Sequence, residues 1–302
     1  MSQPVIASQE TNGPGNSMEP EHPRFSVLHR TAYAYDAPVT ENANSLHLEP
    51  RTFPFQKTLS ATITVLPPTR MRSYRDLFDN RAHYFEVTRP HERLVIESRC
   101  KVVNLPLELP DEARAATLDC YKDQDVRERV WIHQQDSRHV THDTELWHQA
   151  VDLTEGHRSV HDKAEAIRDW IHGNFKYESG STHISTLVGE AFRGRKGVCQ
   201  DFTHIMLGMC RAVGIPARYA SGYLYNGPAD SLVGAQASHA WAEVYLPSVG
   251  WVGYDPTNNC LADERFIKIA VGRDYEDVAP VKGVFNGTAT CTMDVKVVVT
   301  KL

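Results

Sequence analysis

Residues 194–223, "GRKGVCQDFTHIMLGMCRAVGIPARYASGY", join a glycine-bearing loop to an apolar helix and then to a strand. Apolar side chains recur at helical spacing after the loop and form one stripe, at positions 202, 205, 206, 209, 210 and 213. Cys199 stands in the first turn, about 50° from the middle of this stripe, whereas Gln200 and His204 point away from it. The stretch therefore predicts a helix that begins near a cysteine and packs its apolar face on a sheet.

Strand-like segments follow this helix, which a glycine and a proline at positions 214 and 216 bring to an end. They are "PARYASGYLY" at 216–225, "HAWAEVYLP" at 239–247 and "GWVGYDPT" at 250–257, and "CTMDVKVVVTKL" at 291–302 reads as one last strand. The second and third segments are predicted to form a hairpin through "PSVG". A helix packed on an antiparallel sheet is an α+β arrangement.

The helix start and the hairpin bring together three residue types that suit nucleophilic catalysis. A thiol attacks as the thiolate, which a helix N-terminus and a nearby imidazolium both stabilise, so Cys199 is a candidate nucleophile. His239 opens one strand of the hairpin and Asp255 closes the other, so we expect them to be neighbours across the sheet. An Asp that orients a His whose other nitrogen faces a thiol is the arrangement of a catalytic triad. The backbone N–H groups of the helix start would stabilise an oxyanion.

Each of these residues also has a structural interpretation. A cysteine on an apolar helical face is usually a core residue, as we expect for Cys210. A lone His on a strand is usually structural, and an Asp before Pro is usually a turn former. Glu243 lies on the same strand face as His239, and the sequence does not show where Glu243 would lie if the helix covers that face.

A metal site is a further alternative, because histidines are frequent between positions 133 and 183. His157 and His161 are four residues apart, but no cysteine or carboxylate stands at a matching spacing. We therefore interpret most of these histidines as surface residues and expect no metal.

The composition narrows the class of protein. The chain has 302 residues and a formal net charge of −6, which gives no reason to expect binding to nucleic acid or to an anionic membrane. No apolar run approaches the roughly 20 residues of a membrane span. Residues 1–23 are polar and lack the features of a secretory signal, so we expect a flexible tail and a cytoplasmic protein. Six cysteines without a CxxC motif do not indicate disulfides, and most are expected to be reduced and buried.

Three further regions are predicted along the chain. Residues 24–105 contain the strand-like segments "FSVLHRTAYAYDAPV", "SATITVLP", "RAHYFEVTR" and "RLVIESRCKVVNL", which predict an N-terminal β-rich domain, a sandwich or a small barrel. Residues 106–155 are expected to be a connector with a short helix near "DTELWHQAV". Residues 156–302 form the predicted catalytic core, which starts with a helix capped by Ser159.

Three motifs, "GVCQDFTHIMLGMCRAVGIPARYASGY", "SHAWAEVYLPSVGWVGYDPTN" and "GRDYEDVAPVKGVFNG", resemble the bacterial transglutaminase-like cysteine peptidase family. Upstream, "HRTAYAYDAPVTENANSLHLEPR" and "YRDLFDNRAHYFEV" are similar to the N-terminal β region that precedes the core in many members. The resemblance implies a papain-like α+β core with a catalytic triad of Cys199, His239 and Asp255. Asp201 matches a common acidic position of the family, and its role stays open.

The resemblance also implies a class of chemistry. Members form a thioester on the cysteine, here Cys199, and need no metal or other cofactor. We expect a thiol-dependent hydrolase or acyltransferase that acts on amide bonds of a peptide or protein substrate, with water resolving the thioester. One alternative is a cross-linking transglutaminase, in which an amine resolves it. Another is a non-catalytic peptide-binding module, which the presence of Cys199 and His239 disfavours. The sequence leaves the substrate and the oligomeric state open.

Overall fold

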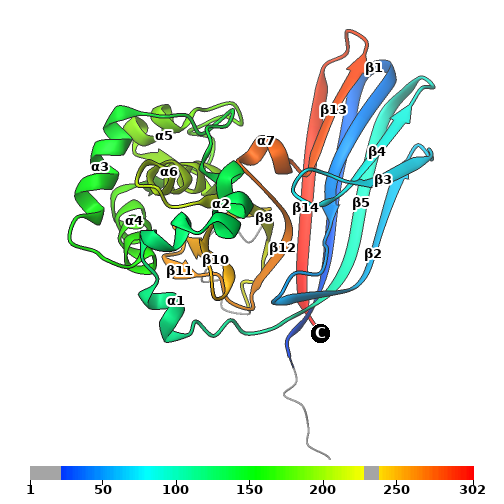
Figure 1. The fold of residues 1–302 in the computed structure, drawn as a ribbon. Helices are drawn as coiled ribbons and strands as arrows, with labels where there is room; N and C mark the ends of the chain where they lie inside the picture. Colours follow the sequence, from blue (N-terminus) through cyan, green and yellow to red (C-terminus); the bar gives the residue numbers. More distant parts are fainter. Residues whose placement is uncertain (1–21, 228–237) are drawn as a thin grey trace, which may run out of the picture.

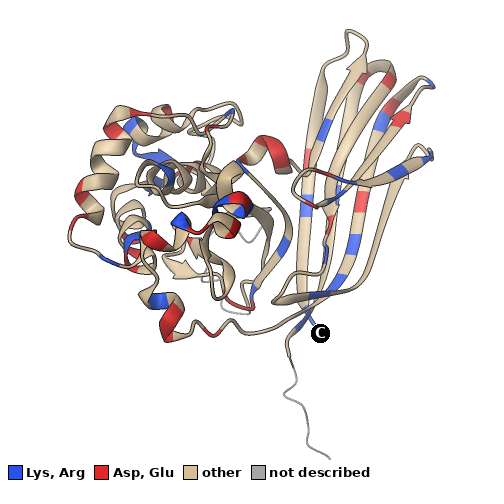
Figure 2. Cartoon of the chain, viewed as in Figure 1, with Lys and Arg blue, Asp and Glu red and all other residues tan. Residues whose placement is uncertain are grey.

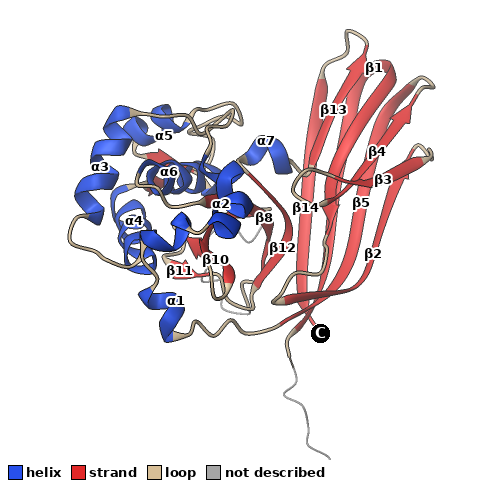
Figure 3. Cartoon of the chain, viewed as in Figure 1, coloured by secondary structure: helices blue, strands red, loops and turns tan. Residues whose placement is uncertain are grey.

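The computed structural model describes residues 22–227 and 238–302, and it contains a long bent sheet beside a region of helices and a second sheet (Figure 1). The helices lie in this second region, and the longest strands lie in the bent sheet (Figure 3). Acidic and basic residues are interspersed over both (Figure 2). The α+β class predicted from the sequence is confirmed. We refer to the two parts as the long sheet and the mixed region.

The long sheet is built around one strand that runs through its whole length. Its members are β1 Arg24–Glu49, β2 Gln56–Leu66, β3 Met71–Arg75, β4 Arg81–Val87, β5 His91–Asn104, β13 Val281–Asn286 and β14 Cys291–Lys301. The first half of β1 pairs with β5 and β14, and the second half pairs with β4 and β13, always antiparallel. On one side of β1 lie β5 and then β4, and on the other side lie β14 and then β13. The chain is interrupted between the two strands on each side.

The long sheet bends where these breaks occur. Pro67 and Pro68 separate β2 from β3, and Pro90 lies between β4 and β5, where a residue without an N–H cannot donate to the ladder. The two bent halves enclose one core of buried side chains, made of Tyr35, Val39, Leu46, Leu48, Phe85, Val87, Leu94 and Ile96. This closure gives the sandwich-like N-terminal region that the sequence predicts.

The C-terminal strands require a correction to the predicted boundaries. The sequence assigns 156–302 as a whole to the catalytic core, but β13 and β14 belong to the long sheet, where Phe25 lies opposite Lys301 and Tyr35 lies opposite Cys291. The alternating pattern of 291–302 does identify a strand. Its partner is set by pairing between the two ends of the chain, and a local pattern carries no information about such pairing.

The mixed region contains the remaining elements. The helices are α1 Asp111–Ala115, η1 Leu118–Lys122, α2 Gln124–Val130, η2 Trp131–Gln134, α3 Thr144–Thr154, α4 Val160–Asn174, α5 Val188–Gly194, α6 Cys199–Ala212 and α7 Tyr275–Val278. The strands β8 Ala217–Leu224, β9 His239–Leu246, β10 Gly250–Asp255, β11 Cys260–Leu261 and β12 Phe266–Gly272 form an antiparallel sheet in the order β11-β10-β9-β8-β12. A parallel pair, β6 Lys176–Tyr177 and β7 Lys196–Gly197, precedes α6. Ser159 caps α4 as predicted, by accepting from the Asp162 N–H at 3.0 Å.

Helix α6 lies at the centre of the mixed region. Its apolar stripe joins Ala240, Ala242 and Val244 of β9 in the main core, and α3, α4 and α5 also pack on it. The sequence predicts that His204 points away from the stripe, but the opposite side of the helix is covered too. His204 is 1% exposed, stacks on His139 and accepts from the Tyr275 N–H at 3.2 Å. The helix is therefore buried on all sides from residue 201 to residue 210.

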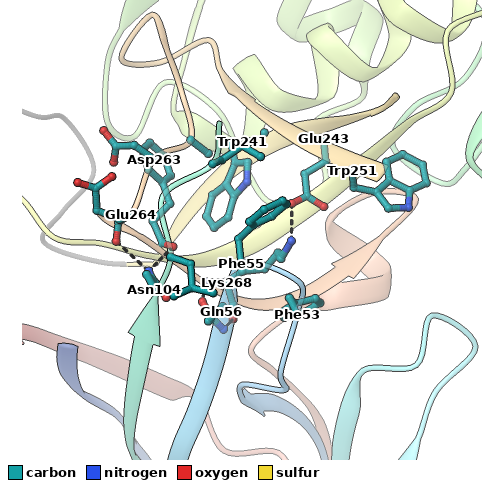
Figure 4. Close-up of a pocket in the computed structure, with 15 residues that line it drawn as sticks. Phe53, Phe55, Gln56, Asn104, Trp241, Glu243, Trp251, Asp263, Glu264 and Lys268 are labelled. Atoms are coloured by element: carbon teal, nitrogen blue, oxygen red, sulfur yellow. Dashed lines mark hydrogen bonds and ion pairs between the residues drawn. The ribbon is translucent and has the colours of Figure 1, made fainter. Parts of the chain in front are cut away.

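Side-chain amides from the long sheet cover the outer edge of β12, and two of them, Gln56 and Asn104, are drawn in Figure 4. Gln56 donates to the Lys268 carbonyl and accepts from the Lys268 N–H, both at 2.7 Å. Asn80 makes the same two contacts with Val271, at 2.7 and 2.9 Å. Asn104 donates to two more carbonyls nearby. An amide carries one acceptor and donors, like a peptide group, so these residues take the place of a neighbouring strand.

We predict that Asn80→Ala lowers the free energy of unfolding by about 2–4 kcal/mol, because it leaves both backbone groups of the buried Val271 without partners. Urea denaturation followed by circular dichroism measures this loss. Asn174→Ala is the matched control, since Asn174 is exposed and makes one hydrogen bond within α4. Its effect is expected to stay within about 0.5 kcal/mol. Equal effects of the two substitutions would contradict the role of Asn80.

Candidate active site

Cys199 is the first residue of α6, and hydrogen bonds of the residues before and after it fix the start of this helix. The N–H of Val198, the preceding residue, donates to Asp201 Oδ2 at 2.8 Å. The Thr182 hydroxyl donates to the same oxygen at 2.6 Å, so Asp201 ties a distant loop to the helix start. Gly197 permits this approach, because a Cβ there would lie 2.6 Å from Asp201 Oδ2. The role of Asp201 that the sequence left open is therefore to cap the helix that carries Cys199.

His239 and Asp255 meet across the β9–β10 hairpin, at the position the sequence predicts. Tyr254 pairs with Ala242, which places the next residue, Asp255, beside the start of β9. His239 Nε2 lies 2.8 Å from Asp255 Oδ2, and both side chains are 0% exposed. A buried charge is stable in a protein when it is paired and fully hydrogen-bonded.

Asp255 meets that condition. The backbone N–H groups of Thr257 and Asn258 donate to Oδ1 at 2.8 and 3.3 Å, and the Asn258 side-chain amide donates to Oδ2 at 2.7 Å. Burial alone would raise the pKa of Asp255, but the charge of His239 and these hydrogen bonds lower it. The ionised carboxylate only accepts hydrogen bonds, so the facing Nε2 of His239 carries a proton.

His239 lies between this carboxylate and the thiol of Cys199. Burial disfavours the charged ring, but Asp255, and then the nearby Cys199, raise the pKa of His239 to about 10. Nε2 is bonded to Asp255, so Nδ1 is the nitrogen left to face the thiol, and Nδ1 forms no hydrogen bond among the described residues. Trp241 and Phe266 pack on the ring at centroid distances of 6.2 and 5.9 Å. The hydrogen bond to Asp255 and these two ring contacts together fix the orientation of the His239 ring.

Glu243 lies on the face of β9 that α6 does not cover. It accepts from Arg218 Nη2 at 2.7 Å and from Lys268 Nζ at 2.6 Å, and these charges lower its pKa although burial opposes this. Trp251 packs on Arg218 and Phe53 packs on Lys268, with 4.2 and 4.3 Å from each charged group to the ring centroid. The cluster faces the long sheet (Figure 4) and forms part of the contact between the two regions. The sequence alone did not show which face of β9 the helix α6 would cover.

Several residues lie near the start of α6 although no pattern in the sequence predicts that they do. Tyr177 of β6 lies opposite Gly197, and burial, with the nearby Cys199 and Asp201, raises the pKa of Tyr177 to about 12. The Gln200 side chain donates to the Ile184 carbonyl at 3.3 Å, so the loop at 182–185 crosses the first turn of α6. That loop lines an open hollow with Arg138, His139 and Glu276. These contacts join distant segments, which a local pattern cannot predict.

In the described part of the chain, the histidines and cysteines outside this site form neither a metal-type cluster nor a disulfide. His161 is buried and bonded to the Tyr254 hydroxyl at 2.7 Å, whereas His157 is exposed. Within residues 22–227 and 238–302, no three His, Cys, Asp or Glu side chains gather as a metal site would require. All six cysteines are free, but fewer are buried than the sequence predicts, since only Cys100 and Cys210 are. No helix in the described part of the chain is long and apolar enough to cross a membrane.

Comparisons with known proteins agree with this geometry. Residues 148–256 match the model of the transglutaminase-like superfamily, and residues 25–103 match that of the bacterial transglutaminase-like N-terminal region. The crystal structure of a provisionally assigned cysteine protease from Cytophaga hutchinsonii is similar, with a TM-score of 0.76 and 25% identity over 93% of this chain and 91% of that one.

Similar sequences occur in several bacteria. An uncharacterised protein of Mycobacterium leprae is 32% identical over 282 residues, which are 92% of this chain and 99% of that protein. One of Mycobacterium tuberculosis is 33% identical over 294 residues, 91% of each chain. A protein-glutamine gamma-glutamyltransferase of Pseudomonas aeruginosa is 35% identical over 94 residues, which are 29% of this chain and 14% of that enzyme.

The raised pKa of His239 predicts a pH dependence of stability. The unfolded ring loses its proton near pH 6.5, whereas the folded ring keeps it until about pH 10. The pair with Asp255 therefore stabilises the fold fully below pH 6.5, and this contribution falls by up to about 1.4 kcal/mol per pH unit as the pH rises toward 10. Urea denaturation at pH 7, 8 and 9 should show a steeper loss for the wild type than for Asp255→Asn.

The control for this experiment is Asp152→Asn, which removes an exposed carboxylate of α3. It should follow the wild-type slope, because other groups that titrate at alkaline pH are unchanged. Parallel slopes for the wild type and Asp255→Asn would show that His239 does not hold its proton.

Proposed function

Because this chain belongs to the transglutaminase-like superfamily and carries the bacterial transglutaminase-like N-terminal region, we propose that it is a thiol-dependent hydrolase or acyltransferase of peptide or amide bonds. One observation carries the proposal: the buried His239–Asp255 pair at 2.8 Å lies beside a cysteine at the start of a buried helix. The catalytic roles of Cys199, His239 and Asp255 are part of the proposal.

In the first half of the reaction, the Cys199 sulfur attacks the carbonyl carbon of the substrate amide. Because the pKa of His239 is raised to about 10, the thiol proton rests on His239 Nδ1 before the attack, and the imidazolium that faces the Cys199 thiolate is stabilised by Asp255 at Nε2. The tetrahedral intermediate then collapses: the C–N bond breaks, His239 gives its proton to the leaving amine, and a thioester remains on Cys199. Asp255 keeps the ring in the required tautomer and does not exchange protons with the substrate.

In the second half, water attacks the thioester. His239 accepts a proton from the water and the carbon–sulfur bond breaks. The carboxylic acid leaves, and the pair of Cys199 thiolate and His239 imidazolium is restored. An amine in place of water would give a new amide by the same steps.

The first turn of α6 supplies groups for the oxyanion of both steps. Among the described residues no hydrogen bond engages the backbone N–H of Cys199, and the N–H groups of a helix start lack partners within the helix. Such a donor stabilises the negative oxygen at the point where it forms, with no reorganisation during the reaction.

Two other functions remain as alternatives. Cross-linking transglutaminase activity is favoured by the partial similarity to the Pseudomonas aeruginosa gamma-glutamyltransferase. A non-catalytic peptide-binding module would use the same fold without the chemistry. We favour hydrolysis of a peptide or protein substrate, because a cross-linker must hold an amine against about 55 M water and exclude solvent. A cytoplasmic location stays a prediction from the sequence.

We predict that iodoacetamide at pH 7 alkylates Cys199 at least about ten-fold faster than Cys291, the exposed thiol of the same chain. The imidazolium of His239 and the start of α6 both stabilise the Cys199 thiolate, whereas Cys291 has neither neighbour. Quenched labelling followed by mass spectrometry gives both rates from one sample. His239→Ala should bring the Cys199 rate down to that of Cys291. If Cys199 reacts no faster than Cys291 in the wild type, the nucleophile assignment fails.

We also predict that a purified sample hydrolyses members of a peptide and amide library, and that Cys199→Ala abolishes this activity without changing the circular dichroism spectrum. Asp255→Asn should reduce kcat by about 10²- to 10⁴-fold. Millimolar primary amine is then added with a substrate that is turned over, and the acid and amide products are quantified. Predominance of the acid supports hydrolysis, and predominance of the amide replaces it with the transglutaminase alternative. Turnover that survives Cys199→Ala would refute both.

A further inference from the structure

Strand β14 forms one margin of the long sheet, as Figure 1 shows. It pairs with β1 along its whole length, from Cys291 opposite Tyr35 to Lys301 opposite Phe25. On its other side β14 has no strand partner among the described residues. An edge of 11 residues with free backbone N–H and C=O groups is a template for a further strand.

The side chains of β14 include few of the kinds that stop an edge strand from pairing with a further strand. Met293, Val295, Val297 and Val299 alternate along one face of β14, and Met293 and Val295 are 57% and 39% exposed. The inner half of this row, Val297 and Val299, packs against the main core of the protein. An edge strand that stays unpaired usually carries several charges, a proline or a bulge. Here the other face carries one acidic and one basic residue, and the pairing with β1 has no register shift.

Those two charges have no ion-pair partner in the part of the chain that the structure describes. Neither Asp294 nor Lys296 forms an ion pair within residues 22–227 and 238–302. The β1 residue opposite Lys296 is Arg30, a like charge, and the one opposite Asp294 is Ala32. An acidic group beside Lys296 would therefore remove a repulsion as well as form a pair.

We propose that two copies of this chain associate through β14, antiparallel, about a two-fold axis at Val295. Directly opposed residues in an antiparallel pair share a face, so the axis must pass through a residue and not between two residues. An axis at Val295 places Asp294 of each copy opposite Lys296 of the other. An axis at Asp294 or at Lys296 would place a charge opposite its own copy. The sequence of β14 therefore selects a single register among these three.

The same register covers the exposed apolar side chains. It places Met293 opposite the partner's Val297 and Val295 opposite its own copy, so the row on each strand continues into the row on the other. Met293, exposed in one chain, then lies beside the partner's residue that already packs on the main core. The two long sheets become one continuous sheet, and a two-fold interface of this kind closes on itself and gives a dimer and no larger assembly.

Charge reversal on the full-length chain tests the proposal. Sedimentation velocity or light scattering should detect a dimer of the wild type between about 1 and 100 µM, the usual affinity range of a small interface. Asp294→Lys and Lys296→Asp should each weaken the dimer at least about ten-fold, because each creates two like-charge contacts. The double variant D294K/K296D restores two opposite-charge pairs and should recover the wild-type dissociation constant. Circular dichroism of each variant checks the fold.

Disulfide cross-linking tests the register. In a Cys291→Ser background, which removes the exposed thiol, Val295→Cys places a thiol directly opposite its own copy and should give a covalent dimer with a mild oxidant. Thr300→Cys is the matched control on the same strand, since the register separates it from its copy by about 33 Å, and it should not cross-link.

A chain that stays monomeric at 100 µM would overturn the proposal. A dimer that is unaffected by either charge reversal, or one in which Thr300→Cys cross-links and Val295→Cys does not, would overturn it as well, because the contact would then lie elsewhere or in another register.

Discussion

The mixed region is arranged around the burial of α6, a helix that is enclosed on every side although it carries polar residues in its first two turns. Burying such a helix costs free energy unless each polar group finds a partner. Asp201 accepts from the Val198 N–H and the Thr182 hydroxyl, Thr203 donates to the Cys199 carbonyl, and His204 accepts from the N–H of the first residue of α7. The contacts of Asp201 and Thr203 also fix the first turn of the helix. The position of the cysteine is therefore a consequence of satisfying the polar groups around it.

The second sheet carries two separate sets of buried charges. One set is the imidazole and carboxylate at the start of β9 and the end of β10, and the other is the cluster of Glu243 with Arg218 and Lys268. Both sets are complete, in that each negative group is matched by positive or hydrogen-bonding neighbours. The long sheet contacts the second set, and the first set lies at the end of the β9–β10 hairpin, next to Cys199 at the start of α6. The contact between the two regions thus stabilises the sheet that carries the candidate site, but it supplies none of the three candidate catalytic residues.

The sequence predicted what depends on neighbours along the chain. The cap of α4, the end of α6, and the hairpin that brings His239 to Asp255 follow from residue types within a few positions of one another. It did not predict what depends on contacts between distant segments. The pairing of β13 and β14 with β1, the amides of Gln56 and Asn80 on β12, and the place of Tyr177 beside the helix start are all of this kind. Periodicity identifies the face of an element, and only the assembled core selects which segment covers it.

The position of β1 at the centre of the long sheet has a consequence for how the chain is made. Its first half lies between β5, which is synthesised soon afterwards, and β14, which is synthesised after the whole mixed region. During translation one side of this 26-residue strand therefore stays open while residues 50–280 are added. A growing chain would expose a long apolar edge throughout that time, which is the situation in which chaperones protect nascent proteins. The order of synthesis and the order of assembly differ here, because β14, which is made after the mixed region, completes the pairing of β1.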